Sequence, residues 1–252
     1  MSLEPWLVGI PGAILAGSAI AVAVKRRVVP WGARKMLLRD ALNKIACGRP
    51  LDYLDDALGA PLRTGALRDS APGRLYRVYR NVHVLVTVTA AGENRTIDAF
   101  SISVRDPNFH FKTGRLTAGL LDVDLAHAAF TSVSDSPEGT RLIIGANRIG
   151  YTEAFYFGNP GYYQTFLLSH NDVAGGDFHY VEGRHEFATG TLTLPALDGE
   201  LSYTPNGTWY GEFRAGTRIN TLTVLDQSAP LDALVTGHSW GIDRGEVDHI
   251  PE

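Results

Sequence analysis

Aromatic residues are most concentrated between residues 151 and 166, where seven aromatic side chains occur. The segments 151–157 and 162–169 are rich in β-favouring residues and similar in length. Between them, residues 159–161 read Asn-Pro-Gly, which places Pro and Gly at the central positions of a type II turn. The pattern predicts an antiparallel hairpin whose aromatic rings fill a core.

A long uncharged stretch near the N-terminus predicts a membrane-spanning helix. Residues 6–24 are 19 positions without a charge, close to the ~20 that a helix needs to cross a bilayer. A buried helix and a cleaved signal peptide are the alternatives. A signal peptide requires basic residues before its apolar stretch, and none precedes this one. Lys25, Arg26 and Arg27 follow it, so the positive-inside rule predicts a single-pass cell-membrane protein with a cytoplasmic C-terminal domain.

Small residues recur every four positions in this stretch. Such a stripe lets two spanning helices approach closely, so it suggests a homodimer formed through Gly9, Ala13, Gly17 and Ala21. The alternative is that small residues are simply common in membrane spans.

Two short helices and a run of strands are predicted between residues 34 and 105. Apolar residues at helical spacing indicate helices over residues 36–46 and 51–58. Each helix is followed by a Gly and then by a Pro, and Gly59 can adopt the positive φ that ends a helix. Alternating apolar positions then predict strands over residues 75–80, 82–88 and 100–104.

This succession of elements resembles the SmpA/OmlA (BamE-like) family, small lipoproteins of the outer-membrane β-barrel assembly machinery. The resemblance covers about residues 38–105 and rests on the strand rhythm and on Gly48, Leu58, Gly59 and Pro61. It implies a BamE-like fold for this unit and a role in interaction or envelope assembly. Family members carry a lipidated Cys directly after the signal segment, whereas Cys47 lies inside the first predicted helix.

The remainder of the chain is predicted to be β-rich. A short helix is expected over residues 124–130, a hairpin turn over 203–209 with a strand continuing to 214, and another strand over 218–225. The predicted class is α+β: an N-terminal transmembrane helix, a short αα-hairpin followed by a mainly antiparallel sheet, and a β-rich C-terminal region. The predicted domains are a membrane anchor with its basic flank, a helix-helix-β-meander unit and the β-rich region, at residues 1–33, 34–105 and 106–252. Residues 34–252 form either two domains or one continuous sheet.

Composition narrows the possible partners. The chain is 44% hydrophobic and 20% charged, as is ordinary for a packed globular protein. A net charge of -4 argues against nucleic acid, which selects clustered basic surfaces. The single Cys47 excludes an intrachain disulfide and a multi-cysteine metal site.

Residues 237–241 match the G-x-S-x-G pattern of α/β-hydrolases, with Ser239 as the nucleophile. That chemistry requires a helix after the Ser and a His and an acid further downstream. Only 11 residues follow the motif, so a turn flanked by glycines is the better interpretation.

Two other groups of polar residues suggest chemistry. Two histidine-containing sets could suggest a metal site: His179, Glu182 and His185, and His238, Asp243, Asp248 and His249. Neither set has the spacing of metal ligands, so solvated polar segments are the favoured interpretation. A possible ligand or partner surface consists of Arg148, Tyr151, Glu153, Tyr156, Asn159 and Tyr163, since binding sites combine apolar walls with a few polar groups. The alternative is that these rings are core and the charges solvated.

The sequence therefore favours a membrane-tethered, non-enzymatic domain that binds an unknown protein or small molecule, with no cofactor and no metal. The alternatives are an envelope-assembly or scaffold protein and, less favoured, a hydrolase that uses Ser239.

Overall fold

The computed structural model describes residues 31–66, 73–92, 95–133, 137–144, 149–158, 163–171, 201–203, 208–227 and 229. By compactness the chain divides into two units, Met1–Asp40 and Ala41–Glu252. Helix α2 (Trp31–Leu42) begins in the first unit and ends in the second. The fold and the sites described below belong to the second unit.

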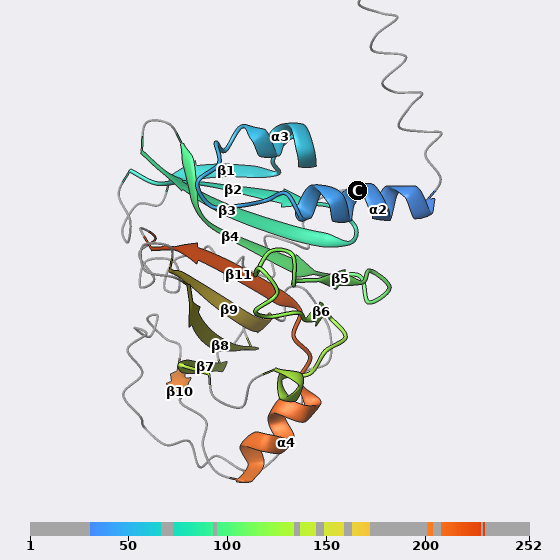
Figure 1. Ribbon diagram of the computed structural model, residues 1–252, viewed down its shortest axis with the longest axis vertical. Helices are drawn as coiled ribbons and strands as arrows, with labels where there is room; N and C mark the ends of the chain where they lie inside the picture. The colour runs from blue at the N-terminus through green and yellow to red at the C-terminus, as the bar shows by residue number, and fades with distance from the viewer. Residues whose placement is uncertain are drawn as a thin grey trace, which may run out of the picture. The chain divides into compact units, whose positions relative to one another are not determined.

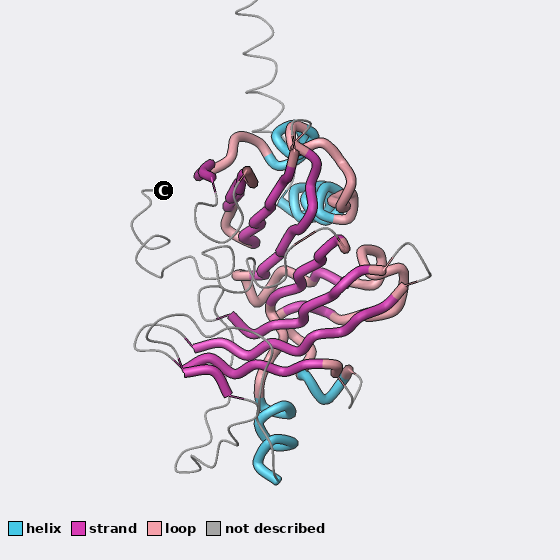
Figure 2. Tube along the Cα trace, turned by 90° about the vertical axis from the view of Figure 1, so that its left-hand side faces the viewer, coloured by secondary structure: helices cyan, strands magenta, loops and turns pink. Residues whose placement is uncertain are grey.

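The described strands of the second unit form a nine-stranded antiparallel sheet and a separate two-stranded one (Figure 1). The large sheet has the order β1-β2-β3-β4-β11-β9-β8-β7-β10, and Figure 2 shows the strand direction turning steadily across it, as expected from strand twist. The strands of the large sheet are β1 (Arg63–Ala66), β2 (Leu75–Arg80), β3 (Val84–Ala91), β4 (Thr96–Val104), β7 (Gly139–Ile144), β8 (Ile149–Phe157), β9 (Gln164–Asn171), β10 (Leu201–Tyr203) and β11 (Thr221–Asp226). The small sheet pairs β5 (Phe111–Lys112) with β6 (Asp124–Leu125).

Alternation along the central strands sorts side chains onto the two faces of the large sheet. Val88 pairs with Phe100, and Phe100 pairs with Val224, so large apolar groups from β3, β4 and β11 share one face. The opposite face carries buried hydroxyl groups in register. Thr221 Oγ1 donates to Ser103 Oγ at 2.8 Å, and the cross-strand hydroxyl pairs thereby satisfy one another in the interior.

The pairing of β4 with β11 joins the early and late parts of the chain. Its register runs from Ser103 opposite Thr221 to Ala99 opposite Leu225. Strands from both sides of the boundary predicted at residue 105 therefore belong to the same sheet.

Several predicted elements are confirmed. Strand β2 has the predicted bounds, and β3 and β4 overlap the strands predicted at residues 82–88 and 100–104. Strands β8 and β9 form the predicted antiparallel aromatic hairpin with Phe155 opposite Phe166. The tip of this hairpin, residues 159–161, lies outside the described residues. Helix α3 (Tyr53–Leu58) is the second short helix, and it is held to β2 because Arg77 Nη1 donates to Asp55 Oδ2 at 2.7 Å.

The predicted fold class is wrong. The described residues form mostly one large antiparallel sheet with few helices, because β11 pairs with β4 and draws the C-terminal strands into the N-terminal meander. The three described α-helices, α2, α3 and α4 (Thr208–Gly216), have 12, 6 and 9 residues, whereas crossing a bilayer takes about 20 apolar residues.

The prediction of a transmembrane helix is corrected accordingly. From residue 31 onward, no described helix combines the length and the apolar character needed to span a membrane. The stretch 6–24, with its stripe of small residues, lies outside the described residues.

Two local predictions in the C-terminal region are also wrong. Residues 124–130 form β6, a turn and the start of a 3-10 helix, η1 (Phe130–Ser132), instead of an α-helix. Residues 208–216 form helix α4 instead of a strand. Four side chains with helical spacing pack on one face of α4 and its C-terminal turn, whereas the prediction had assumed a period of two; they are Tyr210, Phe213, Arg214 and Thr217.

The end of α3 generates a stability prediction. Gly59 has φ 89° and ψ -170°, a backbone region that is essentially restricted to glycine, and a Cβ at this position would meet no atom within 4 Å. Gly59→Val should therefore lower the free energy of unfolding by about 1–3 kcal/mol through backbone strain alone. Ala60→Val, at the exposed neighbouring position, should change it by less than about 0.5 kcal/mol. Urea unfolding of both variants measures the difference, and equal midpoints would contradict the role assigned to Gly59.

Candidate functional site

The predicted ligand surface of the aromatic hairpin is divided between the two faces of the sheet. Tyr151 and Glu153 are fully buried on one face. Tyr156, which is 42% exposed, stacks on Tyr163 with ring centroids 5.1 Å apart, and the alternation along β8 places Tyr156 on the other face. Arg148 and Asn159 lie outside the described residues. The structure therefore does not bring the described members together into one pocket.

Glu153 is the centre of a closed hydrogen-bond cluster between β8 and α4. Arg214 binds its carboxylate through two nitrogens, with Nε 2.7 Å from Oε1 and Nη2 3.2 Å from Oε2. The Tyr151 hydroxyl donates to Glu153 Oε1 at 2.8 Å, and the Tyr210 hydroxyl bonds to that of Tyr151. Arg214 Nη2 also donates to the Phe130 carbonyl at 3.1 Å.

The electrostatics of this cluster indicate a structural role. Burial raises the pKa of the Glu153 carboxyl, and the hydrogen bonds from Arg214 and Tyr151 oppose that rise. Burial also raises the pKa of the Tyr151 hydroxyl, so the phenol remains a hydrogen-bond donor. Each oxygen of the carboxylate accepts a hydrogen bond from Arg214, so the cluster fastens α4 to the sheet.

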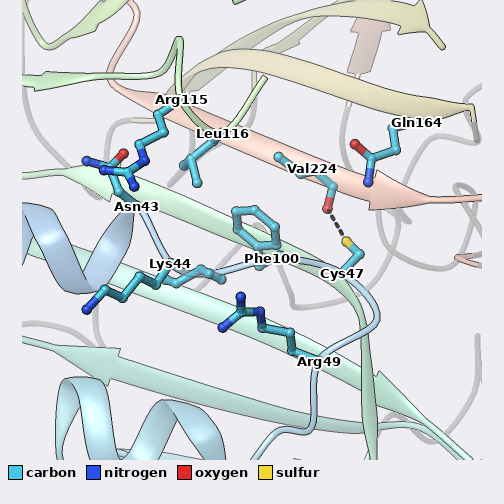
Figure 3. Close-up of a pocket in the computed structure, with 11 residues that line it drawn as sticks. Asn43, Lys44, Cys47, Arg49, Phe100, Arg115, Leu116, Gln164 and Val224 are labelled. Carbon is cyan, nitrogen blue, oxygen red and sulfur yellow. Dashed lines mark hydrogen bonds between the residues drawn. The ribbon is translucent and has the colours of Figure 1, made fainter. Parts of the chain in front are cut away.

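An open pocket lies over β4, β9 and β11 (Figure 3). Its volume is about 290 Å³. Phe100 of β4 and Val224 of β11 form its floor, and Gln164 begins β9 at one end. The remaining lining residues come from the segment that follows α2 and from a turn after β5: Asn43, Lys44, Ile45, Ala46, Cys47, Arg49, Arg115 and Leu116.

The segment that follows α2 is fixed along β4 by backbone hydrogen bonds. Gly48 N donates to the Ile97 carbonyl at 2.8 Å, and Ile97 N donates to the Arg49 carbonyl at 2.8 Å. Gly48 has φ 82°, the positive φ that lets the chain turn alongside the strand. This geometry holds the backbone of Cys47 and Arg49 at the pocket.

The turn that carries Arg115 is held by two buried threonines. Thr113 Oγ1 accepts a hydrogen bond from Val123 N at 2.9 Å, and Thr117 Oγ1 accepts one from Leu121 N at 3.1 Å. Both side chains are at most 1% exposed. Arg115, two residues after Thr113, is consequently presented to solvent at the pocket by a backbone that is fixed from inside.

The pocket is cationic. Lys44, Arg49 and Arg115 are exposed lining residues, and among the described residues no carboxylate forms a salt bridge with any of the three. Arg49 does lie over the Tyr53 ring at 5.0 Å, which leaves its positive charge uncompensated. Uncompensated cations around a concave surface attract an anion.

Asn43 adds a hydrogen-bond acceptor to this cationic pocket. Its Oδ1 is buried and has no hydrogen-bond partner within the part of the chain that the structure describes. An unpaired buried acceptor costs about 1–3 kcal/mol, so a ligand that donated a hydrogen to this atom would recover free energy on binding.

Cys47 lines the pocket as a neutral thiol. Burial, together with repulsion from the carboxylates of Asp226 and Asp98, raises its pKa to about 12. Its Sγ lies 3.5 Å from the Asp98 carbonyl and 4.0 Å from the Val224 carbonyl (Figure 3). Because the thiolate is the nucleophilic form, this cysteine is unsuited to covalent chemistry at neutral pH, and the pocket is equipped for binding.

Comparisons of the chain with protein-family models, curated proteins and solved structures found no match. The resemblance of residues 38–105 to the BamE-like family, the cell-membrane localisation and the envelope-assembly role therefore stay predictions.

Sequence reasoning did not identify the pocket. Its residues are spread from Asn43 to Val224, and the only local signal was the basic character of residues 44–49. The candidate metal sites at residues 179–185 and 238–249 and the candidate nucleophile Ser239 lie outside the described residues.

The buried cluster generates a second stability prediction. Arg214→Met should lower the free energy of unfolding by about 3–5 kcal/mol, because it leaves the buried Glu153 carboxylate without its cation. Adding Glu153→Gln should restore most of this loss, since the neutral amide can still accept from Tyr151. Guanidinium unfolding of the single and double variants measures the coupling. Additive losses would show that the two side chains do not stabilise the fold as a pair.

Proposed function

We propose that this chain is a small-ligand-binding domain whose pocket takes a phosphate-type anion, that is, a small oxyanion group that carries at least one O–H. The observation that carries the proposal is the combination, around one cavity, of three cations without salt-bridge partners and one buried acceptor without a donor, counting partners among the described residues.

Charge supports an anionic ligand. The chain has a net charge of -4, so a pocket lined by Lys44, Arg49 and Arg115 opposes the overall charge of the molecule. Guanidinium groups match the geometry of phosphate and carboxylate oxygens, and a nearby lysine contributes a further positive charge. Because these side chains are exposed, each is expected to contribute modestly to the affinity.

The Asn43 carbonyl supports a protonated oxyanion in particular. Phosphate and its monoesters near neutral pH retain an O–H that can donate to Asn43 Oδ1, whereas sulfate has the same shape and no proton to donate. A buried acceptor that is left unpaired discriminates strongly against a ligand without a donor. The pocket should therefore prefer phosphate to sulfate.

The volume of the pocket and the reactivity of Cys47 narrow the class of ligand further. A volume of about 290 Å³ is at the lower end of the range for ligand pockets, about 300–1,000 Å³, and it favours a small molecule over a dinucleotide. The raised pKa of the Cys47 thiol supports binding without covalent chemistry.

The proposal is tested by calorimetric titration of the full chain with inorganic phosphate and with sulfate. Phosphate should bind with one site per chain and about tenfold more tightly than sulfate, the ratio that corresponds to one satisfied buried acceptor. Arg115→Ala should weaken phosphate binding about 3- to 10-fold. Lys112→Ala, which removes an exposed cation outside the pocket, is the matched control and should leave the affinity unchanged.

Asn43→Leu separates recognition from general charge attraction. It removes the unpaired acceptor, so it should not destabilise the fold, and it should abolish the preference for phosphate over sulfate. Equal affinities for the two anions in the wild type, or equal losses in Arg115→Ala and Lys112→Ala, would overturn the proposal.

A further inference from the structure

Two histidines and one aspartate converge on the small sheet formed by β5 and β6. One ligand atom from each of His110, Asp124 and His127 lies within 4.8 Å of the other two. His110 Nδ1 is 2.9 Å from Asp124 Oδ2, and the two imidazole rings stack with centroids 3.9 Å apart. No pocket residue is among the three, so this cluster is distinct from the anion pocket.

Backbone structure places the three side chains. Residue Lys112 of β5 pairs with Asp124 of β6, which sets His110 near the end of β6. The chain then reverses, because the backbone N–H groups of His127 and Ala128 both bind the Asp124 carbonyl. Ala126, at the centre of this reversal, has φ 68°.

A positive φ is costly for a residue with a Cβ, and such backbone strain concentrates at functional sites. The strained turn at Ala126 is what brings His127 back against His110. The sequence carries no glycine there to relieve it.

Two further features give the cluster the properties of a metal site. Asp124 Oδ1 accepts a hydrogen bond from Phe111 N at 3.1 Å, which orients the carboxylate and leaves Oδ2 toward His110, as outer hydrogen bonds do for metal ligands. His127 Nε2 is buried and has no hydrogen-bond partner among the described residues. A buried imidazole nitrogen without a partner is available as a ligand atom.

We propose that His110, Asp124 and His127 bind a divalent transition-metal ion, with Zn²⁺ as the representative. Two imidazole nitrogens favour Zn²⁺, Co²⁺, Ni²⁺ or Cu²⁺ over Mg²⁺ and Ca²⁺, which take oxygen ligands. Three protein ligands leave at least one coordination position for water or another small ligand.

Formation of the site requires only local adjustment. Metal bonds of about 2.0–2.1 Å in a tetrahedral site hold ligand atoms about 3.3 Å apart, so the three atoms must move closer together than their present limit of 4.8 Å. The His110 side chain is 59% exposed and can rotate without disturbing the core.

The test is titration of the metal-free full chain with Zn²⁺ against a chromophoric chelator, together with the visible spectrum of the Co²⁺ complex. One equivalent should bind, the Co²⁺ spectrum should show mixed nitrogen and oxygen ligands, and the ring ¹⁵N signals of His110 and His127 should shift on Zn²⁺ addition. His110→Ala, His127→Gln and Asp124→Asn should each weaken binding at least tenfold.

Asp122→Asn is the matched control, because it changes an exposed carboxylate two positions from Asp124 and should leave the affinity unchanged. Should His127→Gln fail to fold, His110→Ala still provides the test, since it removes a largely exposed side chain. No stoichiometric Zn²⁺ binding by the wild type, or undiminished binding in His110→Ala with unshifted ring signals, would overturn the proposal.

Discussion

β4 and β11 pair over five residue positions, from Ser103 opposite Thr221 to Ala99 opposite Leu225, and the rest of the second unit depends on this contact. It closes a segment of about 118 residues, at an entropic cost of about 4 kcal/mol. Four almost fully buried apolar side chains of the two strands each contribute about 1.5–3 kcal/mol; they are Phe100, Ile102, Leu222 and Val224. The free energy gained by burying these side chains therefore outweighs the entropic cost of closing the loop, and the pairing can hold the two parts of the chain together.

The same pairing builds the anion pocket. It sets Phe100 beside Val224 as the floor, and through β9 it brings Gln164 to the side where Cys47 lies. The backbone of residues 43–49 is hydrogen-bonded to β4, so without β11 its cations would face an incomplete cavity. The ion pair between Glu153 and Arg214 fastens α4 to β8, and its buried charges act as a structural fastening distinct from the binding surface.

Local patterns predicted the elements whose stabilising partners are close in sequence. The strands at residues 75–80 and 100–104 and the hairpin with Phe155 opposite Phe166 follow from alternation and turn residues alone. Helix α4 was predicted as a strand, whose alternation would place Tyr210 and Phe213 on opposite faces. Tyr210, Phe213 and Arg214 share one face of the helix instead, and that face packs against β8. Three features depend on contacts or turn geometry that no local pattern encodes. They are the pairing of β4 with β11, the pocket, and the cluster of His110 with His127.

Chemical-shift mapping of the ¹⁵N-labelled chain during a titration with inorganic phosphate tests the central claim, that the β4–β11 pairing assembles one anion-binding pocket from separate segments. Residues 43–47, 49, 115, 116, 164 and 224 line this pocket, and their backbone amides report on its occupation. Their signals should shift together and yield one common dissociation constant, while the signals of β1 and β2 should stay in place. Shifts confined to one of these segments, or small shifts spread over all exposed basic residues, would contradict both the proposed assembly and its binding role.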